Sequence, residues 1–143
     1  MLIAEMNPQE LKERTKQFAL RVMRLVDALP RTAKGNAVAG QLMRSGTSVA
    51  ANYRACRARS RAEFVAKIGV VEEEADETAL WLELIIEDKI LPEKKIVSLL
   101  VEANELVAIM AASYISAARN KRDVSLNSRS AISNQRSKIR NQK

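Results

Sequence analysis

The chain has 143 residues, of which 47% are hydrophobic, 3% aromatic and 29% charged. This length suits one domain with an aliphatic, alanine-rich core. Because the sequence has no histidine, it excludes Ser-His-Asp and Cys-His catalysis, imidazole zinc sites and the Glu-x-x-His pairs of di-iron bundles. One cysteine, Cys56, excludes an internal disulfide, and its place on an apolar stripe favours a small buried hydrophobe over a reactive thiol.

Targeting and ligand signals are weak. The N-terminal segment MLIAEMNPQE lacks the charged-then-apolar layout of a signal peptide, and no apolar run approaches the 18 residues of a membrane span. We therefore expect a soluble cytoplasmic protein with no membrane partner. The four glycines lie in helix-like patterns and form no phosphate-binding loop, so we expect no cofactor.

Charge is divided sharply along the chain. Residues 1–62 hold 12 Lys or Arg and 4 Asp or Glu, a net of +8, whereas residues 63–118 hold 4 and 12, a net of −8. Residues 119–143 hold 8 and 1, a net of +7. The formal net charge of +7 thus hides a basic first half, an acidic second half and a basic tail.

The first predicted helix begins at Asn7, which is followed by Pro8 in the first turn and by Glu10 three residues on, a capping-box pattern. Leu29-Pro30 ends it, because the residue before proline avoids helical angles. Its inner stripe comprises Leu11, Thr15, Phe18, Val22, Leu25 and Leu29.

Residues 35–57 predict a second helix, with Thr32 as its N-cap, that carries two adjacent stripes at helical spacing. One stripe runs through Val38, Leu42, Ser45, Val49, Asn52 and Cys56. The other runs through Ala39, Met43, Gly46, Ala50, Tyr53 and Arg57. Gly46 costs up to about 1 kcal/mol relative to alanine in a helix, so we expect a close helix contact there. Two stripes on one helix indicate contact beyond its own bundle, hence an oligomer.

Ser60 and Glu63 form a second capping box, which predicts a third helix from about residue 61 to about residue 89. Its inner stripe comprises Phe64, Ile68, Val71, Ala75, Thr78, Leu82 and Ile85. Pro92 suits the first turn of a fourth helix. The inner stripe of that helix comprises Ile96, Leu100, Ala103, Val107, Met110, Tyr114 and Ala117, widened by Leu99, Leu106 and Ile109.

Four helices with short connections and no strand pattern predict an all-α protein, an antiparallel up-down four-helix bundle over residues 1–119. From residue 120 the apolar pattern fails. The polar, basic composition of residues 120–143 cannot bury enough surface to offset ordering entropy, which predicts a disordered basic tail.

Several separated motifs occur in order: RSGTSVAANYR at residues 44–54, RARS at 57–60, EF at 63–64, Lys67, EADE at 74–77 and WLE at 81–83. Over residues 8–119 the chain resembles the bacterial four-helix-bundle proteins related to those encoded within intervening sequences of large-subunit rRNA genes. The accessory protein of diversity-generating retroelements is a more distant relative.

The resemblance implies a ring-like homopentamer and favours nucleic-acid binding, either RNA or DNA. It also suggests a protein partner such as a reverse transcriptase, because the retroelement accessory protein works with one. The family brings no catalytic residues, and we therefore predict that the protein is not an enzyme.

A basic patch is predicted at Arg44, Arg54, Arg57, Arg59 and Arg61. These arginines could contact phosphates, meet the acidic half of an adjacent subunit in a head-to-tail ring, or stay solvated. The acidic patch predicted for that interface comprises Glu73, Glu74, Asp76 and Glu77. The basic tail is open to two interpretations, a nucleic-acid arm or a solubilising tail.

Three further residues are predicted to give the assembly its specificity. A buried Asn52 and Ser45 must find hydrogen-bond partners and would fix helix register or subunit pairing. Trp81 suits a core edge or an interface anchor.

A metal-dependent nucleotide pyrophosphatase is the minor alternative. Glu73 with Asp76, and Glu102 with Glu105, place paired carboxylates one turn apart, where oxygen ligands could hold Mg²⁺. The spacing is common in charged helices, so we predict no metal site. The main hypothesis is an oligomeric scaffold that binds RNA or DNA through an arginine-rich surface on the first two helices. The principal alternative is a protein-interaction ring without nucleic-acid affinity.

Overall fold

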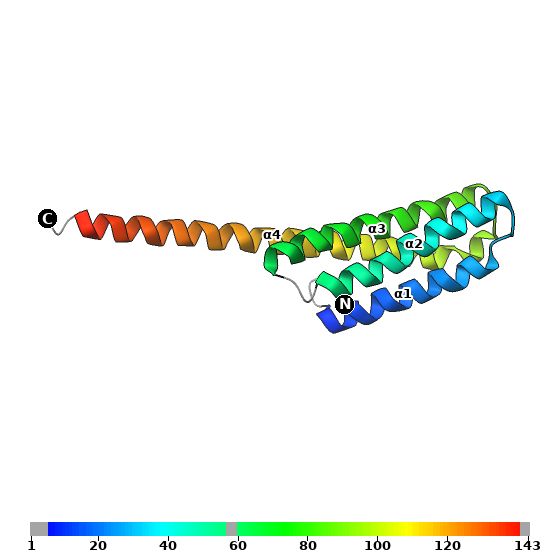
Figure 1. The fold of residues 1–143 in the computed structure, drawn as a ribbon, viewed down its shortest axis with the longest axis horizontal. Helices are drawn as coiled ribbons and strands as arrows, with labels where there is room; N and C mark the ends of the chain where they lie inside the picture. Colours follow the sequence, from blue (N-terminus) through cyan, green and yellow to red (C-terminus); the bar gives the residue numbers. More distant parts are fainter. Residues whose placement is uncertain (1–5, 57–59, 141–143) are drawn as a thin grey trace.

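The computed structural model describes residues 6–56 and 60–140. It contains α1 (Pro8–Ala28), α2 (Ala33–Cys56), α3 (Arg61–Glu87) and α4 (Val97–Arg140), with a 3₁₀ turn, η2 (Glu93–Lys95), before α4. No strand occurs in these two described stretches. The helices run up and down beside one another (Figure 1), which confirms the predicted all-α fold.

Local capping fixes two helix starts as the sequence predicts. At α1, the Asn7 side chain accepts a hydrogen bond from the Glu10 backbone N–H, and the Glu10 carboxylate accepts one from the Asn7 backbone N–H. At α3, Ser60 and Glu63 form the same reciprocal pair. These bonds satisfy N–H groups that have no partner inside the helix.

The other two starts differ from each other. Thr32 Oγ1 accepts a hydrogen bond from the Gly35 N–H at 3.0 Å, which confirms Thr32 as the cap of α2. Pro92, predicted in the first turn of the fourth helix, instead precedes η2, and α4 begins only at Val97. Pro92 has an extended ψ of 134°, so the regular helix cannot start at that residue.

The core follows the predicted inner stripes. The predicted stripe Leu11, Thr15, Phe18, Val22 and Leu25 of α1 is buried, and so is Leu29 at its C-cap. The fully enclosed residues of α3 and α4 include Ile68, Leu82, Ile85, Leu106 and Met110, and Ile96 just before α4 is also enclosed. Cys56 is also fully buried, and its thiol donates to the Tyr53 carbonyl. One expectation was wrong: Tyr114 is 42% exposed, because it lies over Gly69 at the margin of the α3–α4 contact.

At Gly46, α2 lies in close contact with Val22 of α1. A Cβ placed there would lie 2.7 Å from Val22 Cγ1, closer than van der Waals contact allows. This geometry confirms the close helix contact predicted at Gly46.

The seam between α1 and α4 is polar. These two helices contact each other far less than the α1–α2, α2–α3 and α3–α4 pairs do. The Arg14 guanidinium reaches across and donates to Glu102 at 2.5 Å and also to Glu105. Farther along, Arg21 donates to the Ser98 hydroxyl at 2.9 Å. Charged contacts therefore close the side of the bundle where apolar packing is least.

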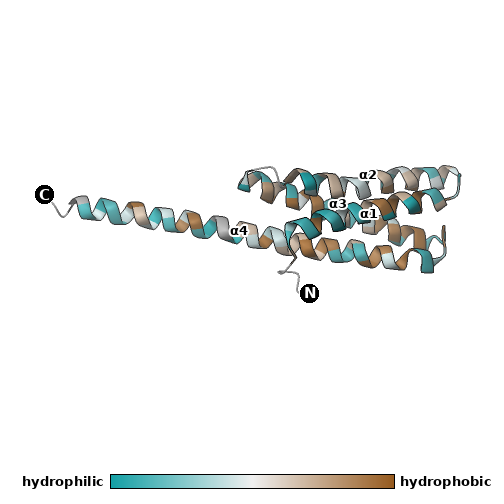
Figure 2. Ribbon diagram, turned by 90° about the horizontal axis from the view of Figure 1, so that it is seen from below, coloured by the Kyte–Doolittle hydropathy of each residue, from teal (hydrophilic) through white to brown (hydrophobic). Residues whose placement is uncertain are grey.

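Helix α4 continues well beyond the bundle. It leaves the end at which α1 begins and α2 ends (Figure 1). Sequence composition predicted a disordered tail from residue 120, whereas the structure continues α4 as one helix to Arg140. Residues 122–138 are all exposed, and Figure 2 shows mostly hydrophilic residues along this part. A helix forms its backbone hydrogen bonds within itself, so the composition of an exposed segment does not reveal that it is helical.

Within the bundle, α4 is unusually apolar on two sides. Its most apolar 18-residue window has a mean hydropathy of 1.4, which meets the length and composition requirement of a membrane span, yet only 28% of that window is buried. The inner side packs in the core, and Arg14 of α1 neutralises two of the helix's carboxylates. Outside, Val97, Val101 and Ile115 are 41–52% exposed. The helix thus serves the core and also leaves an apolar outer stripe.

Candidate functional site

A basic groove runs between α1 and α2. Its walls and floor are formed by Lys12, Lys16, Ala19, Thr47, Ala50, Ala51 and Arg54, around about 380 Å³. The two lysines lie one turn apart on α1, which places their ammonium groups along the same edge. Alanines form the floor because α1 and α2 approach closely near Gly46. We call this feature the basic groove.

The predicted arginine patch is only partly assembled. Arg54 lies in the basic groove, and Arg61 is exposed at the first turn of α3. Arg57 and Arg59 lie outside the described residues. Arg44 is separate, because it donates to Glu74 at 3.2 Å and to Glu77 on α3. The Arg44 charge is therefore matched by acids of its own chain.

The Arg44 pair changes the acidity of Glu77. The hydrogen bond from Arg44 lowers the pKa of Glu77 below its ordinary value, and partial burial opposes this effect. Hydrogen bonding to the charged form of a carboxylate favours that form. Two residues of the predicted acidic patch, Glu74 and Glu77, thus stabilise the α2–α3 contact.

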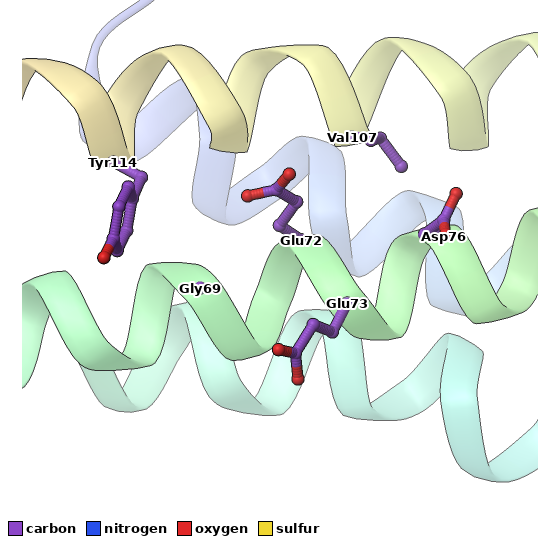
Figure 3. Close-up of a pocket in the computed structure, with 6 residues that line it drawn as sticks. All are labelled: Gly69, Glu72, Glu73, Asp76, Val107 and Tyr114. Atoms are coloured by element: carbon purple, nitrogen blue, oxygen red, sulfur yellow. The ribbon is translucent and has the colours of Figure 1, made fainter.

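An acidic groove occupies the opposite pair of helices, α3 and α4. It is lined by Gly69, Glu72, Glu73, Asp76, Val107 and Tyr114 around about 540 Å³. Figure 3 shows Glu72 and Asp76 on the side of α3 that faces α4, whereas Glu73 points away from α4. The Tyr114 ring reaches from α4 toward Gly69, where an added Cβ would lie 3.8 Å from Tyr114 Cε2, an ordinary van der Waals distance. We call this feature the acidic groove.

Ser45 is buried, as predicted, at the α2–α3 contact. It is fully enclosed, and its hydroxyl is hydrogen-bonded to the Thr78 hydroxyl at an Oγ–Oγ1 distance of 2.9 Å. Thr78 is also enclosed and donates to the Glu74 carbonyl at 2.8 Å. A shared polar contact in an apolar interface helps to fix the register of two helices.

Asn52 is half-buried, so the prediction of a buried asparagine was wrong. Its amide donates to the Ser48 carbonyl and hydroxyl at 2.9 and 2.8 Å, and its oxygen accepts from Lys67 at 3.3 Å. These bonds lie at the edge of the α2–α3 contact. They leave Asn52 with local partners in its own chain.

Trp81 lies at a core edge beside an apolar groove of about 490 Å³ lined by Lys34, Val38, Trp81, Leu84, Glu87, Asp88 and Ile90. The indole is near enough to Glu77 to help lower the pKa of that carboxyl. Its Nε1 is nevertheless buried without a hydrogen bond of normal geometry to the described residues. Trp81 therefore contributes mainly apolar area.

The two carboxylate pairs considered for a metal ion do not form one site. Glu102 and Glu105 bind Arg14, whereas Glu73 and Asp76 line the acidic groove. In residues 6–56 and 60–140, no three His, Cys, Asp or Glu side chains gather where they could hold a metal ion. Arg14 lies between the Glu102 and Glu105 carboxylates and supplies the positive charge that a metal ion would supply there.

Sequence reasoning missed part of both grooves. It did not assign Lys12, Lys16, Thr47 or Ala51 to a site, and it placed Ala50 only on an apolar stripe of the second helix. Two patterns in the sequence pointed to this groove: the four-residue spacing of Lys12 and Lys16, and the run of small residues in the second helix. Neither pattern alone shows that these lysines and small residues lie side by side in the fold.

The fold is an all-α helical bundle that carries a basic groove and an acidic groove on different helix pairs. Residues 8–112 match the family described as 23S rRNA-intervening sequence protein. The chain belongs to this family.

A solved structure supports the same assignment. It is titled a protein with unknown function from the S23 ribosomal protein family of Bacteroides thetaiotaomicron VPI-5482. It is 30% identical to this chain, with a TM-score of 0.70, over 76% of this chain and 98% of the other. No curated protein matches the sequence.

Proposed function

We propose that this protein is a homo-oligomeric scaffold that binds RNA or DNA through the basic groove. The groove itself carries the proposal: Lys12, Lys16 and Arg54 surround a floor of small side chains. None of the ion pairs formed by the described residues uses these three cations. Cations without internal partners attract phosphates, and a flat floor lets a nucleic-acid backbone come close.

Two further observations support a nucleic acid as the ligand. The family's description refers to an intervening sequence of 23S rRNA, and the resemblance to this family favours nucleic-acid binding. The groove is also open and lined by long lysine side chains, which suits an extended polyanion better than a small molecule held on all sides.

Apolar surface supports self-association. Met43 on α2, Leu80 on α3 and Val101 on α4 are 38–51% exposed. The second stripe of α2, predicted to reach beyond the bundle, is only half covered within one chain: Ala39 and Ala50 are half-buried. Unpartnered apolar surface of this kind is typical of oligomer interfaces, and the family resemblance implies a pentamer.

A protein-interaction ring without nucleic-acid affinity is the second candidate. The acidic groove and the basic groove lie on different helix pairs of one chain. In a head-to-tail assembly, the acidic groove of one copy would meet the basic groove of the next. That arrangement would neutralise Lys12, Lys16 and Arg54 and shield them from phosphates.

The deciding experiment measures binding of the full chain to single-stranded RNA, duplex RNA and duplex DNA over a series of salt concentrations. The test variant is Lys12→Gln/Lys16→Gln/Arg54→Gln. The control, Arg24→Gln/Lys94→Gln/Lys95→Gln, removes the same charge from exposed sites away from the groove. We expect only the test variant to flatten the salt dependence, lowering the slope of log K against log salt by about 0.7–0.9 for each phosphate that the protein no longer neutralises.

No detectable binding at low salt to any of these nucleic acids would overturn the proposal. Equal decreases in affinity for the test and control variants would also overturn it, because they would show attraction to net charge and not to the groove. Light scattering on the same samples measures the oligomeric state.

A further inference from the structure

The part of α4 that projects beyond the bundle carries a row of arginines. Arg122, Arg129 and Arg136 are seven residues apart, and all three are exposed. In an α-helix seven residues make almost two turns, so these side chains lie on one face, about 10.5 Å apart along the axis. We call this row the arginine stripe.

The projection is strongly and almost uniformly cationic. Residues 119–140 contain seven Lys or Arg and one acid, Asp123. None of the ion pairs formed by the described residues lies in this part of the chain. A helix of 22 residues is about 33 Å long, and along it seven positive charges outnumber one negative charge.

The small polar residues of the projection turn inward. Ser128 donates to the Val124 carbonyl and Ser137 to the Ser133 carbonyl, each at 2.8 Å. These hydroxyls therefore stay close to the helix backbone, while the longer arginines extend past them.

The shape and chemistry of this rod-like projection favour duplex DNA. The major groove of B-form DNA is about 12 Å wide and admits an α-helix, whereas the A-form major groove of RNA is too narrow. Residues 119–143 contain no aromatic side chain, so they offer no platform on which unpaired bases could stack. A polyanion with regularly spaced phosphates complements the stripe.

We propose that residues 119–140 form a DNA-binding helix, in which Arg122, Arg129 and Arg136 contact the phosphates that border the major groove. This inference deepens the proposed function by adding a second contact element and a preferred ligand. It concerns a part of the chain beyond the family match, which ends at residue 112. The rod leaves the bundle at the end where α1 begins and α2 ends (Figure 1), which is also the end that carries Lys12 and Arg54 of the basic groove.

The first test compares duplex DNA binding by the full chain and by Arg122→Gln/Arg129→Gln/Arg136→Gln. The Arg24→Gln/Lys94→Gln/Lys95→Gln variant again serves as the equal-charge control. Removing three arginine–phosphate pairs should lower the salt slope by about 2.7 and weaken binding roughly tenfold or more. A decrease no greater than that of the control would overturn the inference.

The second test separates a helix from a charged flexible chain. Asn127→Pro leaves every charge in place but breaks the helix between Arg122 and Arg129, and Asn127→Ala keeps the helix. We expect the proline variant to lose most of the stripe's contribution and the alanine variant to bind like the parent. Equal binding by the two variants would overturn the helical stripe.

Different outcomes test the preference for DNA and the proposed function. Binding of duplex RNA as tight as that of duplex DNA would overturn the DNA preference. If the stripe variant binds normally while the basic-groove variant does not, the proposed function stands and this inference falls. If instead the basic-groove variant binds normally while the stripe variant does not, the inference stands and the basic groove is not the contact surface.

Discussion

At the scale of single residues, Gly46 sets the distance between α1 and α2. Its missing side chain lets Val22 approach within a distance that any Cβ would violate. Gly40, six residues earlier on the same helix, is exposed and has no atom within 4 Å of the position of a Cβ. Gly46 and Gly40 therefore differ in whether neighbouring atoms occupy the space that a Cβ would need.

We expect Gly46→Ala to destabilise the protein by about 1–3 kcal/mol, because the added methyl group must displace packed side chains. Gly40→Ala should stabilise it by up to about 1 kcal/mol, the difference in helix propensity. Urea denaturation measures both free energies of unfolding. A neutral Gly46→Ala variant would contradict the close contact.

The Arg44–Glu77 pair makes stability depend on pH. Because the folded pKa of Glu77 lies below its ordinary value of 4.5, the contribution is complete above pH 4.5 and is lost as the pH falls through the folded pKa. Arg44→Gln removes the main cause of the shift. We expect the variant to be less stable than the parent above pH 4.5, with the difference shrinking at lower pH.

Thermal unfolding at a series of pH values measures that difference. Arg54→Gln is the matched control, since Arg54 belongs to no ion pair among the described residues. A pH profile that is parallel for parent and Arg44→Gln would contradict the role assigned to the pair. Both side chains are partly exposed, so we expect a modest effect that salt reduces.

At the scale of elements, the α1–α4 seam depends on Arg14. Its guanidinium lies between Glu102 and Glu105, and the side chains of Arg14 and Glu102 are mostly covered. Removing the arginine would leave two carboxylates facing each other with no counter-charge. The seam has little apolar packing that could replace the missing interaction.

We expect Arg14→Gln to cost about 1–3 kcal/mol of unfolding free energy. Arg21→Gln, on the same helix, loses only a bond to a hydroxyl and should cost less. Adding Glu102→Gln to Arg14→Gln should restore part of the stability, since it removes one uncompensated charge. Absence of any rescue in this double variant would count against an electrostatic seam.

Element starts and core faces were predictable because their causes are local. Asn7 with Glu10, and Ser60 with Glu63, specify helix starts through bonds that span three residues. The inner stripes follow from spacing alone. The start of α4 was predicted too early, because an extended Pro92 and the short η2 turn depend on how α3 and α4 are joined.

The grooves were less predictable, because they depend on which helices become neighbours. Nothing local to Arg44 shows that α3 will offer it Glu74 and Glu77. The pairing of Arg14 with two residues some ninety positions away is equally invisible before the bundle is assembled. Composition predicted the basic charge of residues 119–140 but not their helical form, since exposed helices leave no apolar pattern.

At the scale of the whole molecule, the two charged grooves predict the outcome of a charge exchange. In a head-to-tail assembly, Glu73→Lys/Asp76→Lys should dissociate the oligomer, and so should Lys12→Glu/Lys16→Glu. All four substitutions in one chain restore opposite charges and should restore assembly. Glu83→Lys/Glu93→Lys, at exposed sites outside the acidic groove, is the control.

Light scattering gives the mass of each variant in solution. An unchanged mass for both double variants would show that the grooves do not meet each other. That result would leave the basic groove open to nucleic acid, which makes the assembly experiment informative for the proposed function as well.

Helix α4 runs without a break from the buried Ile96 region into the projecting rod. The packing of α4 in the bundle therefore sets the direction, around the helix axis, of every side chain beyond the bundle. One alanine inserted after Ala118 would rotate all later side chains by about 100°, and seven inserted residues would return them to within about 20° of their original direction. The direction in which the outermost arginines point is thus set by the packing of core leucines and isoleucines tens of ångströms away.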